Sequence, residues 1–297
     1  MSVIPLLAAL AIVAPSDGTV VSAQKPLRLA WRGETNAVYL LRIACAGHEP
    51  QVFAISNRTD AYVGNLEVCN RFDWSVRAAG SLDSARAHFV TDETLPRQLR
   101  ADGVREFRDL GGWRTASGSR VRQGRILCSA ALRGRVTDSG IATLRSDFGI
   151  RTDVDLRSRK GLSSDRGTVL GEDVAWKSIP FCSGRRIDDV VDGRESFASV
   201  FALLTDPGRH PVLLEDGDGL ARANALGFLL NGLLGVSEEN LRANWTASPK
   251  ELEELIGYLK LLSGETLRAR IESYARGCGI ADAEIEAFRS LMLEESK

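Results

Sequence analysis

Hydrophobic and polar residues alternate over short stretches in the first third of the chain. The alternating stretches are 27–31, 37–44, 51–55, 72–77 and 85–90, and Gly, Asn and Asp residues separate them. A period of two is typical of strands that bury one face, and short strands at this spacing favour an all-β sandwich. We therefore expect residues 16–93 to form a small β-sandwich with Trp31 and Trp74 in its core.

After residue 93 the pattern changes to strands that alternate with helices. Apolar runs at 150–156, 174–179 and 210–214 predict strands. Helical periodicity covers 139–148, 195–204, 221–234 with an interruption at Asn231-Gly232, and most of 237–295. This order indicates an α/β fold. We expect residues 94–297 to form a central sheet flanked by helices.

The chain begins with an apolar run over residues 3–14. The run is too short to span a bilayer, and no Lys or Arg precedes it as in a typical signal peptide. Two interpretations stay open. Residues 1–15 are a signal or leader segment, with export to the periplasm or the exterior, or they form an N-terminal strand of a cytoplasmic protein.

Charge and cysteine content exclude several classes of function. The chain has 38 basic and 39 acidic residues, for a net charge of −1. Nucleic-acid-binding proteins carry a basic excess, so no nucleic-acid partner is expected. The five cysteines include no CxxC pair, which argues against a zinc site or a disulfide scaffold. Small molecules or proteins remain as the expected partners.

Residues 212–230 join an apolar strand, a glycine-containing loop and an apolar helix. The loop reads Glu215-Asp216-Gly217-Asp218-Gly219-Leu220, and the helix begins with Ala221-Arg222. In this arrangement backbone N–H groups and the helix dipole converge on an anion. Residues 215–222 are therefore the candidate phosphate-binding loop.

This loop resembles that of the tyrosine and dual-specificity phosphatase superfamily, in particular bacterial members with a β-sandwich before the catalytic domain. The resemblance covers most of residues 100–297 and includes the blocks 107–112, 129–132, 149–158 and 230–237. The pattern of residues 16–93 resembles a fibronectin type III or immunoglobulin-like module. That module implies a role in packing, substrate presentation or binding of a protein partner.

The family's loop reads His-Cys-x-x-Gly-x-x-Arg-Thr/Ser, in which the cysteine attacks phosphorus and the arginine binds two phosphate oxygens. Gly219 and Arg222 match this pattern, but Asp216 stands at the cysteine position and Glu215 at the histidine position. Other positions depart from the residues that relatives commonly carry, namely Glu106 for Asn, Cys128 for Arg, Ala221 for Asp and Ala223 for a hydroxyl residue.

The resemblance thus implies a phosphatase scaffold without the cysteine mechanism and without a cofactor. Its ligand, if any, would be a phosphorylated protein or a small phosphoester. We expect Glu215, Asp216 and Asp218 to repel a phosphate dianion, with only Arg222 opposing them. Arg222 would then pair with Asp216 or Asp218. The favoured hypothesis is a catalytically silent protein that binds or scaffolds other proteins.

Two alternatives stay open. Asp216-Gly-Asp218-Gly resembles the Asp-x-Asp-Gly motif of haloacid-dehalogenase-type phosphatases, which would make Asp216 a nucleophile and Asp218 a proton-transfer group with Mg²⁺. Against this, the chain after Asp218 has helical patterns where that fold needs strands. The second alternative is a phosphate or phosphoprotein sensor that uses Arg222.

The remaining candidates for chemistry are weaker. Cys182 lies in a stretch that could border the pocket, and a bystander thiol is favoured. The acidic run 188–192 falls where some phosphatases of the resembled superfamily place a general-acid loop, and a solvated loop is favoured. The three histidines are scattered and offer no nucleophile–base pair. Asp153 and Asp155 form a second acidic pair, which we interpret as part of an ordinary strand.

Overall fold

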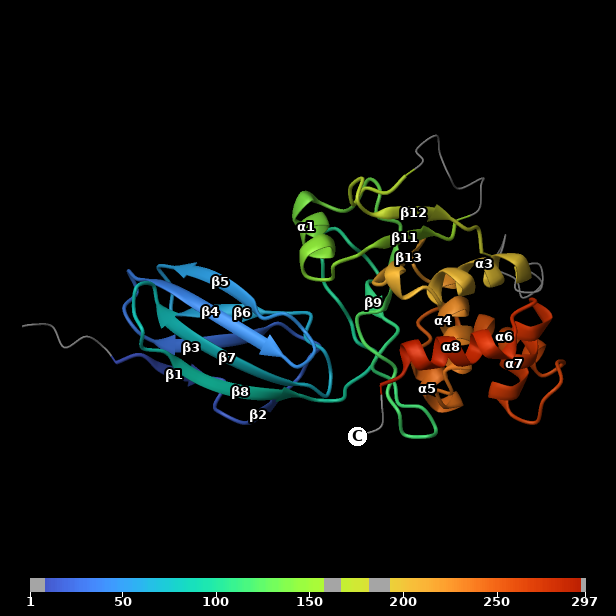
Figure 1. The fold of residues 1–297 in the computed structure, drawn as a ribbon, viewed down its shortest axis with the longest axis horizontal. Helices are drawn as coiled ribbons and strands as arrows, with labels where there is room; N and C mark the ends of the chain where they lie inside the picture. Colours follow the sequence, from blue (N-terminus) through green and yellow to red (C-terminus); the bar gives the residue numbers. More distant parts are fainter. Residues whose placement is uncertain (1–8, 158–166, 182–192, 295–297) are drawn as a thin grey trace, which may run out of the picture. The chain divides into compact units, whose positions relative to one another are not determined.

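The computed structural model describes residues 9–157, 167–181 and 193–294. The chain divides into two compact units, Met1–Arg97 and Gln98–Lys297 (Figure 1). No helix within the described ranges is long and apolar enough to cross a membrane.

The N-terminal unit consists of two sheets. One has the order β1-β3-β6, and the other has the order β2-β8-β7-β4-β5. The strands are β1 (Ala11–Ala14), β2 (Thr19–Val21), β3 (Leu27–Arg32), β4 (Val38–Cys45), β5 (Gln51–Ser56), β6 (Asp60–Val63), β7 (Arg71–Ala78) and β8 (Ala85–Thr91). The alternating stretches correspond to β3, β4, β5, β7 and β8, so the strand prediction is confirmed for these segments.

A single hydrophobic core joins the two sheets. It contains Trp31 from β3 and Tyr39 from β4, whose rings lie 5.3 Å apart edge to face, together with Trp74 from β7. Burial alternates along β7, as expected when one face of a strand packs on a core. Part of the segment that the leader interpretation covers, Ala11–Ala14, is a strand paired with β3, while residues 1–8 lie outside the described ranges.

The C-terminal unit is an α/β fold with one five-stranded sheet of order β12-β11-β13-β10-β9. The strands are β9 (Arg108–Asp109), β10 (Ile126–Ala130), β11 (Thr152–Asp155), β12 (Ala175–Ser178) and β13 (Val212–Asp216). Neighbouring strands run parallel except for β9, which is antiparallel to β10. The carboxyl ends of β10, β11 and β13 therefore meet at one edge of the sheet, where ligands of open α/β sheets usually bind.

Helices flank this sheet. They are α1 (Asp138–Ser146), α3 (Arg194–Leu204), α4 (Ala221–Leu233), α5 (Glu238–Ala243), α6 (Pro249–Leu259), α7 (Leu267–Gly277) and α8 (Asp282–Met292). Leu127 and Leu213 of the sheet share a core with Leu144 of α1. Figure 1 shows α4 to α8 gathered together, apart from α1. The predicted central sheet with flanking helices is confirmed.

Helix α4 follows the central strand β13 and is buried along most of its length. The interruption predicted at Asn231-Gly232 is wrong, because the helix continues through both residues. The Asn231 side chain donates a hydrogen bond to the Leu110 carbonyl at 3.1 Å, and a Cβ on Gly232 would collide with Ile271 of α7. Asn and Gly have low helix propensity, and here tertiary contacts at both residues stabilise the helix.

Candidate functional site

The candidate loop connects the end of β13 to the start of α4. Gly217–Leu220 lie between the two elements. Leu220 is the N-cap residue of α4 and its side chain makes no capping hydrogen bond, and no acidic residue lies in the first turn of the helix. The first N–H groups of a helix need an acceptor from elsewhere. The Asp216 carboxylate supplies one, since its Oδ2 accepts the Arg222 N–H at 3.0 Å.

The Asp216 carboxylate lies inside the loop. Its Oδ1 accepts the Gly217 N–H at 2.7 Å and the Arg222 Nη1 at 2.7 Å. The Asp216 side chain is completely buried, and that of Arg222 is 20% exposed. Two backbone N–H groups and one guanidinium thus converge on one anion, as they would on a phosphate. The anion here is a side chain of the loop itself.

Glu215 points away from this arrangement, contrary to the expectation that three carboxylates face one phosphate. Consecutive strand residues point to opposite faces of a sheet. Glu215 Oε2 accepts the Leu132 N–H at 3.0 Å, and Oε1 lies 3.9 Å from Arg157. Its charge therefore acts on the opposite face of β13 from that of Asp216.

Asp218 and Gly219 shape the outer part of the loop. Asp218 is exposed, and its Oδ1 accepts the Leu220 N–H at 3.0 Å. Gly219 has a φ of +78°, and a Cβ there would lie 2.6 Å from the Ala130 nitrogen and 2.8 Å from the Glu106 Cβ. Only glycine fits this conformation and this close approach.

Arg108 binds the backbone of the loop and is a site residue that the sequence did not reveal. It is 1% exposed, and its Nη1 donates to the Gly219 carbonyl at 3.0 Å and to the Glu106 carbonyl at 3.3 Å. Its Nε and Nη2 have no hydrogen-bond partner in the described part of the chain. The signal available in the sequence was its place in the block 107–112, directly after Phe107.

Glu106 adds a carboxylate beside Gly219 in a strained backbone conformation. It is exposed and has a φ of +51°, in the left-handed region that disfavours a Glu side chain. Asn tolerates this region better than Glu because its short side chain can hydrogen-bond locally.

Glu106→Asn is expected to raise the free energy of unfolding by about 0.5 to 1 kcal/mol through relief of this strain. Chemical denaturation of the C-terminal unit measures the change. Glu265→Asn is the matched control, since Glu265 is exposed in a loop of the same unit and is absent from the positive-φ residues. Equal effects of both substitutions would show that Glu106 stores no strain.

Buried acidic groups lie on the face of the sheet opposite Asp216. Asp155 is in register with Glu215, and Asp153 is in register with Leu213. Arg157 binds Asp155 through Nε and Nη2 at 2.9 and 2.6 Å. Asp153 and Asp155 were interpreted as ordinary strand residues, but both are almost fully buried.

This burial changes the protonation of the acidic groups. Desolvation, with a further contribution from the charge of Glu215, raises the pKa of Asp153 well above its ordinary value. Desolvation and the charge of Asp155 raise the pKa of Glu215, although the Leu132 N–H and Arg157 oppose the shift. Asp153 and Glu215 therefore retain protons at pH values where exposed acids would lose them.

None of the described cysteines lies in the candidate loop. Cys128 of β10 is completely buried, and desolvation raises the pKa of its thiol to about 11. A thiol with such a pKa is a poor nucleophile at neutral pH because the thiolate is the reactive form. Cys182 and the acidic run 188–192 lie outside the described ranges.

The remaining residues considered in the sequence lie inside the fold or at the start of a helix. Ala223 is buried in α4, and Ala221 begins that helix. His210 is 2% exposed, and its ring nitrogens lie 3.1 Å from the Arg125 carbonyl and 2.9 Å from the Leu204 carbonyl. It therefore serves to join the start of β13 to its neighbours.

The structure offers no centre for Mg²⁺ at the loop. Both oxygens of Asp216 already accept hydrogen bonds, and one of them pairs with Arg222. No group of three or more His, Cys, Asp or Glu residues that could hold a metal occurs within the described ranges.

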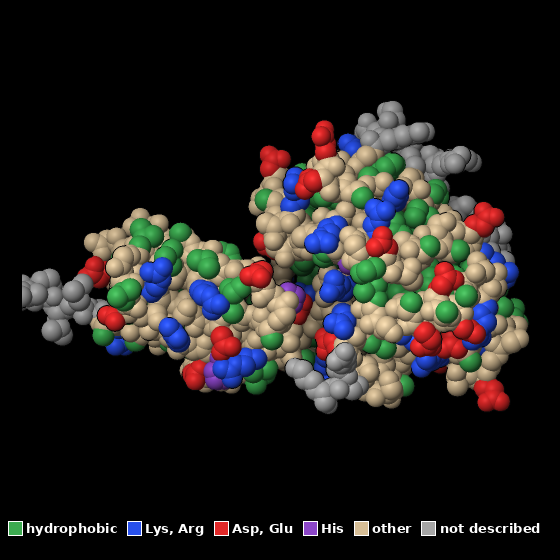
Figure 2. Space-filling view, in the orientation of Figure 1, with side chains coloured by type: hydrophobic (Ala, Val, Ile, Leu, Met, Phe, Trp, Pro, Cys, Tyr) green, Lys and Arg blue, Asp and Glu red, His purple; other side chains and the backbone are tan. Residues whose placement is uncertain are grey.

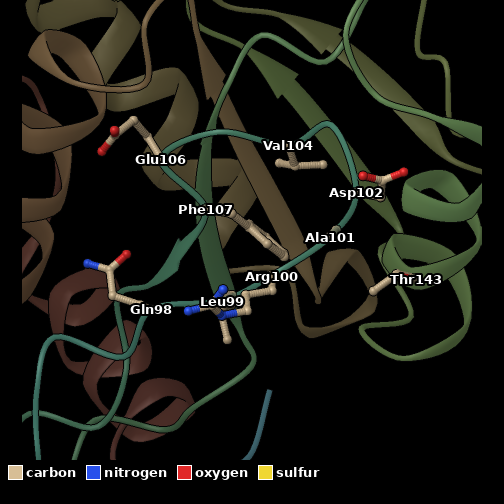
Figure 3. Close-up of a pocket in the computed structure, with 9 residues that line it drawn as sticks. All are labelled: Gln98, Leu99, Arg100, Ala101, Asp102, Val104, Glu106, Phe107 and Thr143. Carbon is tan, nitrogen blue, oxygen red and sulfur yellow. The ribbon is translucent and has the colours of Figure 1, made fainter. Parts of the chain in front are cut away.

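A separate hollow lies beside Glu106 (Figure 3). It is lined by Gln98, Leu99, Arg100, Ala101, Asp102, Val104, Glu106, Phe107 and Thr143. Glu106 is the member of this lining that also borders Gly219. The lining excludes Asp216 and Arg222, so the hollow and the loop are distinct features of the surface.

Comparison with known proteins identifies relatives of the C-terminal unit. A family model described as "Tyrosine phosphatase family" matches residues 99–276, which is more than half of the chain. A protein of Cupriavidus necator with the provisional name of a tyrosine-protein phosphatase is 29% identical over 177 residues, or 50% of this chain. The aligned region spans 62% of that relative's own length.

The solved structures that resemble the chain have low sequence identity to it. The core catalytic domain of the PP-IP phosphatase Siw14 from S. cerevisiae, in complex with citrate, is 11% identical, with a TM-score of 0.34, over 50% of this chain and 80% of that one. A second structure of the Siw14 catalytic core is 13% identical, with a TM-score of 0.36, over 56% and 85%. Fibronectin(III)-like modules of Clostridium thermocellum CbhA are 12% identical, with a TM-score of 0.23, over 31% and 100%.

Proposed function

Since the chain belongs to the tyrosine phosphatase family, we propose that it is a catalytically silent member in which Asp216 occupies the position of the nucleophilic cysteine. The surviving role is binding or scaffolding of proteins. The observation that carries the proposal is the position of the Asp216 carboxylate, which takes up the donors that a substrate phosphate needs.

Two physical effects oppose catalysis at this loop. The first is occupation of the donors. The buried Asp216 carboxylate already accepts hydrogen bonds from the Gly217 and Arg222 N–H groups and pairs with the Arg222 guanidinium. The second is repulsion. Two like charges about 4 Å apart interact by roughly 4 kcal/mol at an effective dielectric constant of about 20. A phosphate dianion at the loop would meet Asp216 directly and approach the exposed Glu106 and Asp218.

Attack by Asp216 itself is also disfavoured. A carboxylate nucleophile needs a free oxygen aligned with phosphorus and a cation to neutralise charge. Asp216 has no exposed surface, and Arg222 holds its Oδ1 in the ion pair. The metal-dependent alternative through Asp216 and Asp218 would first have to break this pair.

The purified chain is expected to hydrolyse an aryl phosphate no faster than buffer, either with Mg²⁺ or with chelator, because Asp216 is buried in its ion pair with Arg222. Asp216→Cys is measured beside it, with Asp218→Cys as the control that places a thiol at the neighbouring exposed acid. Rescue by Asp216→Cys would locate the defect at that position, and lack of rescue would implicate Ala221 and Ala223 as well.

Turnover that requires Mg²⁺ and disappears in Asp216→Asn would replace this proposal with the aspartyl mechanism. Binding of phosphotyrosine without hydrolysis, lost in Arg222→Ala, would favour the sensor hypothesis instead. Both assays use the same preparations, so they separate the three hypotheses directly.

A further inference from the structure

The edges of the two N-terminal sheets differ in how well they are protected. Natural sheet edges are short, bulged, charged or covered, because unpaired backbone groups otherwise recruit another strand. The outer strand β1 has an irregular register between Ile12 and Ala14, and β2 has three residues. Strand β6 has four residues, and its Asp60 pairs with Arg28 and Arg58.

Strand β5 is neither short nor bulged, and it carries no charged residue. It has six residues and pairs with β4 without a break in register, from Val38 opposite Ser56 to Ile43 opposite Gln51. It lies at the end of its sheet, with no strand on its outer side among the residues that the structure describes (Figure 1). Its sequence, Gln-Val-Phe-Ala-Ile-Ser, contains neither charge nor proline in a chain that is 26% charged.

The side chains of β5 are exposed as well as its backbone edge. Val52 is 61% exposed and Phe53 is 38% exposed, and Val38 on the neighbouring strand is 43% exposed. Because Ile55 packs against the core, Val52 and Ala54 project from the other face of the sheet. An incoming strand would therefore gain backbone hydrogen bonds and apolar contacts together. Figure 2 shows charges of both signs over the visible face.

We propose that β5 pairs antiparallel with β5 of a second copy of this chain and so joins two five-stranded sheets into one. A two-fold axis near Phe53 and Ala54 would place uncharged residues against uncharged residues. The ends of the strand have opposite charges. Exposed Glu49 precedes β5, and Arg58 follows it in a group with Arg28 and Asp60 that keeps one net positive charge. Antiparallel pairing brings the Glu49 end of each strand beside the Arg58 end of the other, twice per dimer.

The interface is small, since one pair of edge strands and a few side chains bury less than about 1,000 Å². Association is therefore expected to be concentration-dependent and reversible. Light scattering of the full chain should show an average mass that rises from 32.3 kDa towards twice that value as concentration rises to roughly 100 µM.

Val52→Lys is expected to weaken association at least tenfold, because each copy would place a charge at the shared edge. Leu82→Lys is the matched control, since Leu82 is 99% exposed and lies outside the strands. Hydrogen exchange provides a second measurement that needs no variant. The amides of β5 that point away from β4 should lose protection on dilution, whereas those of β7 should not.

A monomer at every concentration would overturn the proposal and leave a strand from another protein as the occupant to be sought. A dimer that Val52→Lys and Leu82→Lys leave equally intact would also overturn it. So would dilution that dissociates the dimer without changing exchange in β5. None of these results depends on phosphatase activity, so the proposal stands or falls independently of the proposed function.

Discussion

Asp216→Ala is expected to lower the free energy of unfolding of the C-terminal unit by about 2 to 4 kcal/mol and to create a binding site for inorganic phosphate. The substitution removes the acceptor of the Gly217 and Arg222 N–H groups and leaves the Arg222 guanidinium without its buried counter-ion. A vacated loop retains converging donors and the N-terminus of α4, which attract an oxyanion.

Thermal unfolding in phosphate and in chloride of equal ionic strength tests this expectation. Phosphate should stabilise Asp216→Ala by about 1 to 3 kcal/mol at concentrations well above its dissociation constant, and it should leave the native chain nearly unchanged. Asp218→Ala is the matched control, because Asp218 is exposed and its substitution keeps the Asp216–Arg222 pair.

The outcome separates two explanations of a silent loop. Stabilisation of the variant alone would identify the carboxylate as the occupant of the anion site. If phosphate stabilised the native chain as strongly as Asp216→Ala, the carboxylate would not block the loop, and the observation behind the proposed function would lose its force.

Arg157→Met is expected to destabilise the C-terminal unit by about 3 to 5 kcal/mol at pH 8, and by less at pH 5. Arg157 is the cation that binds the buried Asp155 and lies near Glu215. Its removal leaves buried carboxylates that can reduce their mutual repulsion only by taking up protons. Proton uptake is easier at pH 5, so the cost of the substitution should fall there.

The free energy of unfolding of the native chain should also fall as pH rises, but by less than in Arg157→Met. The pKa values of Asp153 and Glu215 are raised by folding, so both groups bind protons in the folded state that the unfolded state has released. Their contribution to stability is fully present below about pH 4 and is lost as pH rises through the raised values. Asp153→Asn should therefore stabilise the chain at pH 8 and flatten the profile.

Chemical denaturation between pH 5 and pH 8 measures both effects. Arg145→Met is the matched control, because the Arg145–Asp173 pair is exposed, with 44% and 68% of the two side chains accessible. Exposed pairs contribute about 0 to 1 kcal/mol, so this control should change little with pH. A cost of Arg157→Met that is equal at both pH values would contradict the account of the buried acids.

The local pattern of the chain was sufficient for most of the fold. Period-two alternation predicted β3, β4, β5, β7 and β8, and the boundary expected after residue 93 lies close to the division after Arg97. Short strands such as β2 and β6 were missed, because three or four residues carry too little periodicity. The strand–loop–helix at residues 212–230 was also recognisable from the order of its apolar and glycine residues.

What the sequence by itself determined is therefore the order of elements, the membership of residues 215–222 in one loop and the absence of a cysteine from that loop. Only the tertiary structure decided where the charges point. It directs Asp216 into the loop and Glu215 to the opposite face, and it places Arg108 behind Gly219. It also leaves β5 at an edge. These features depend on strand order and on contacts between residues that are distant in the sequence. The periodicity of one segment does not show which residue of another strand a side chain will contact.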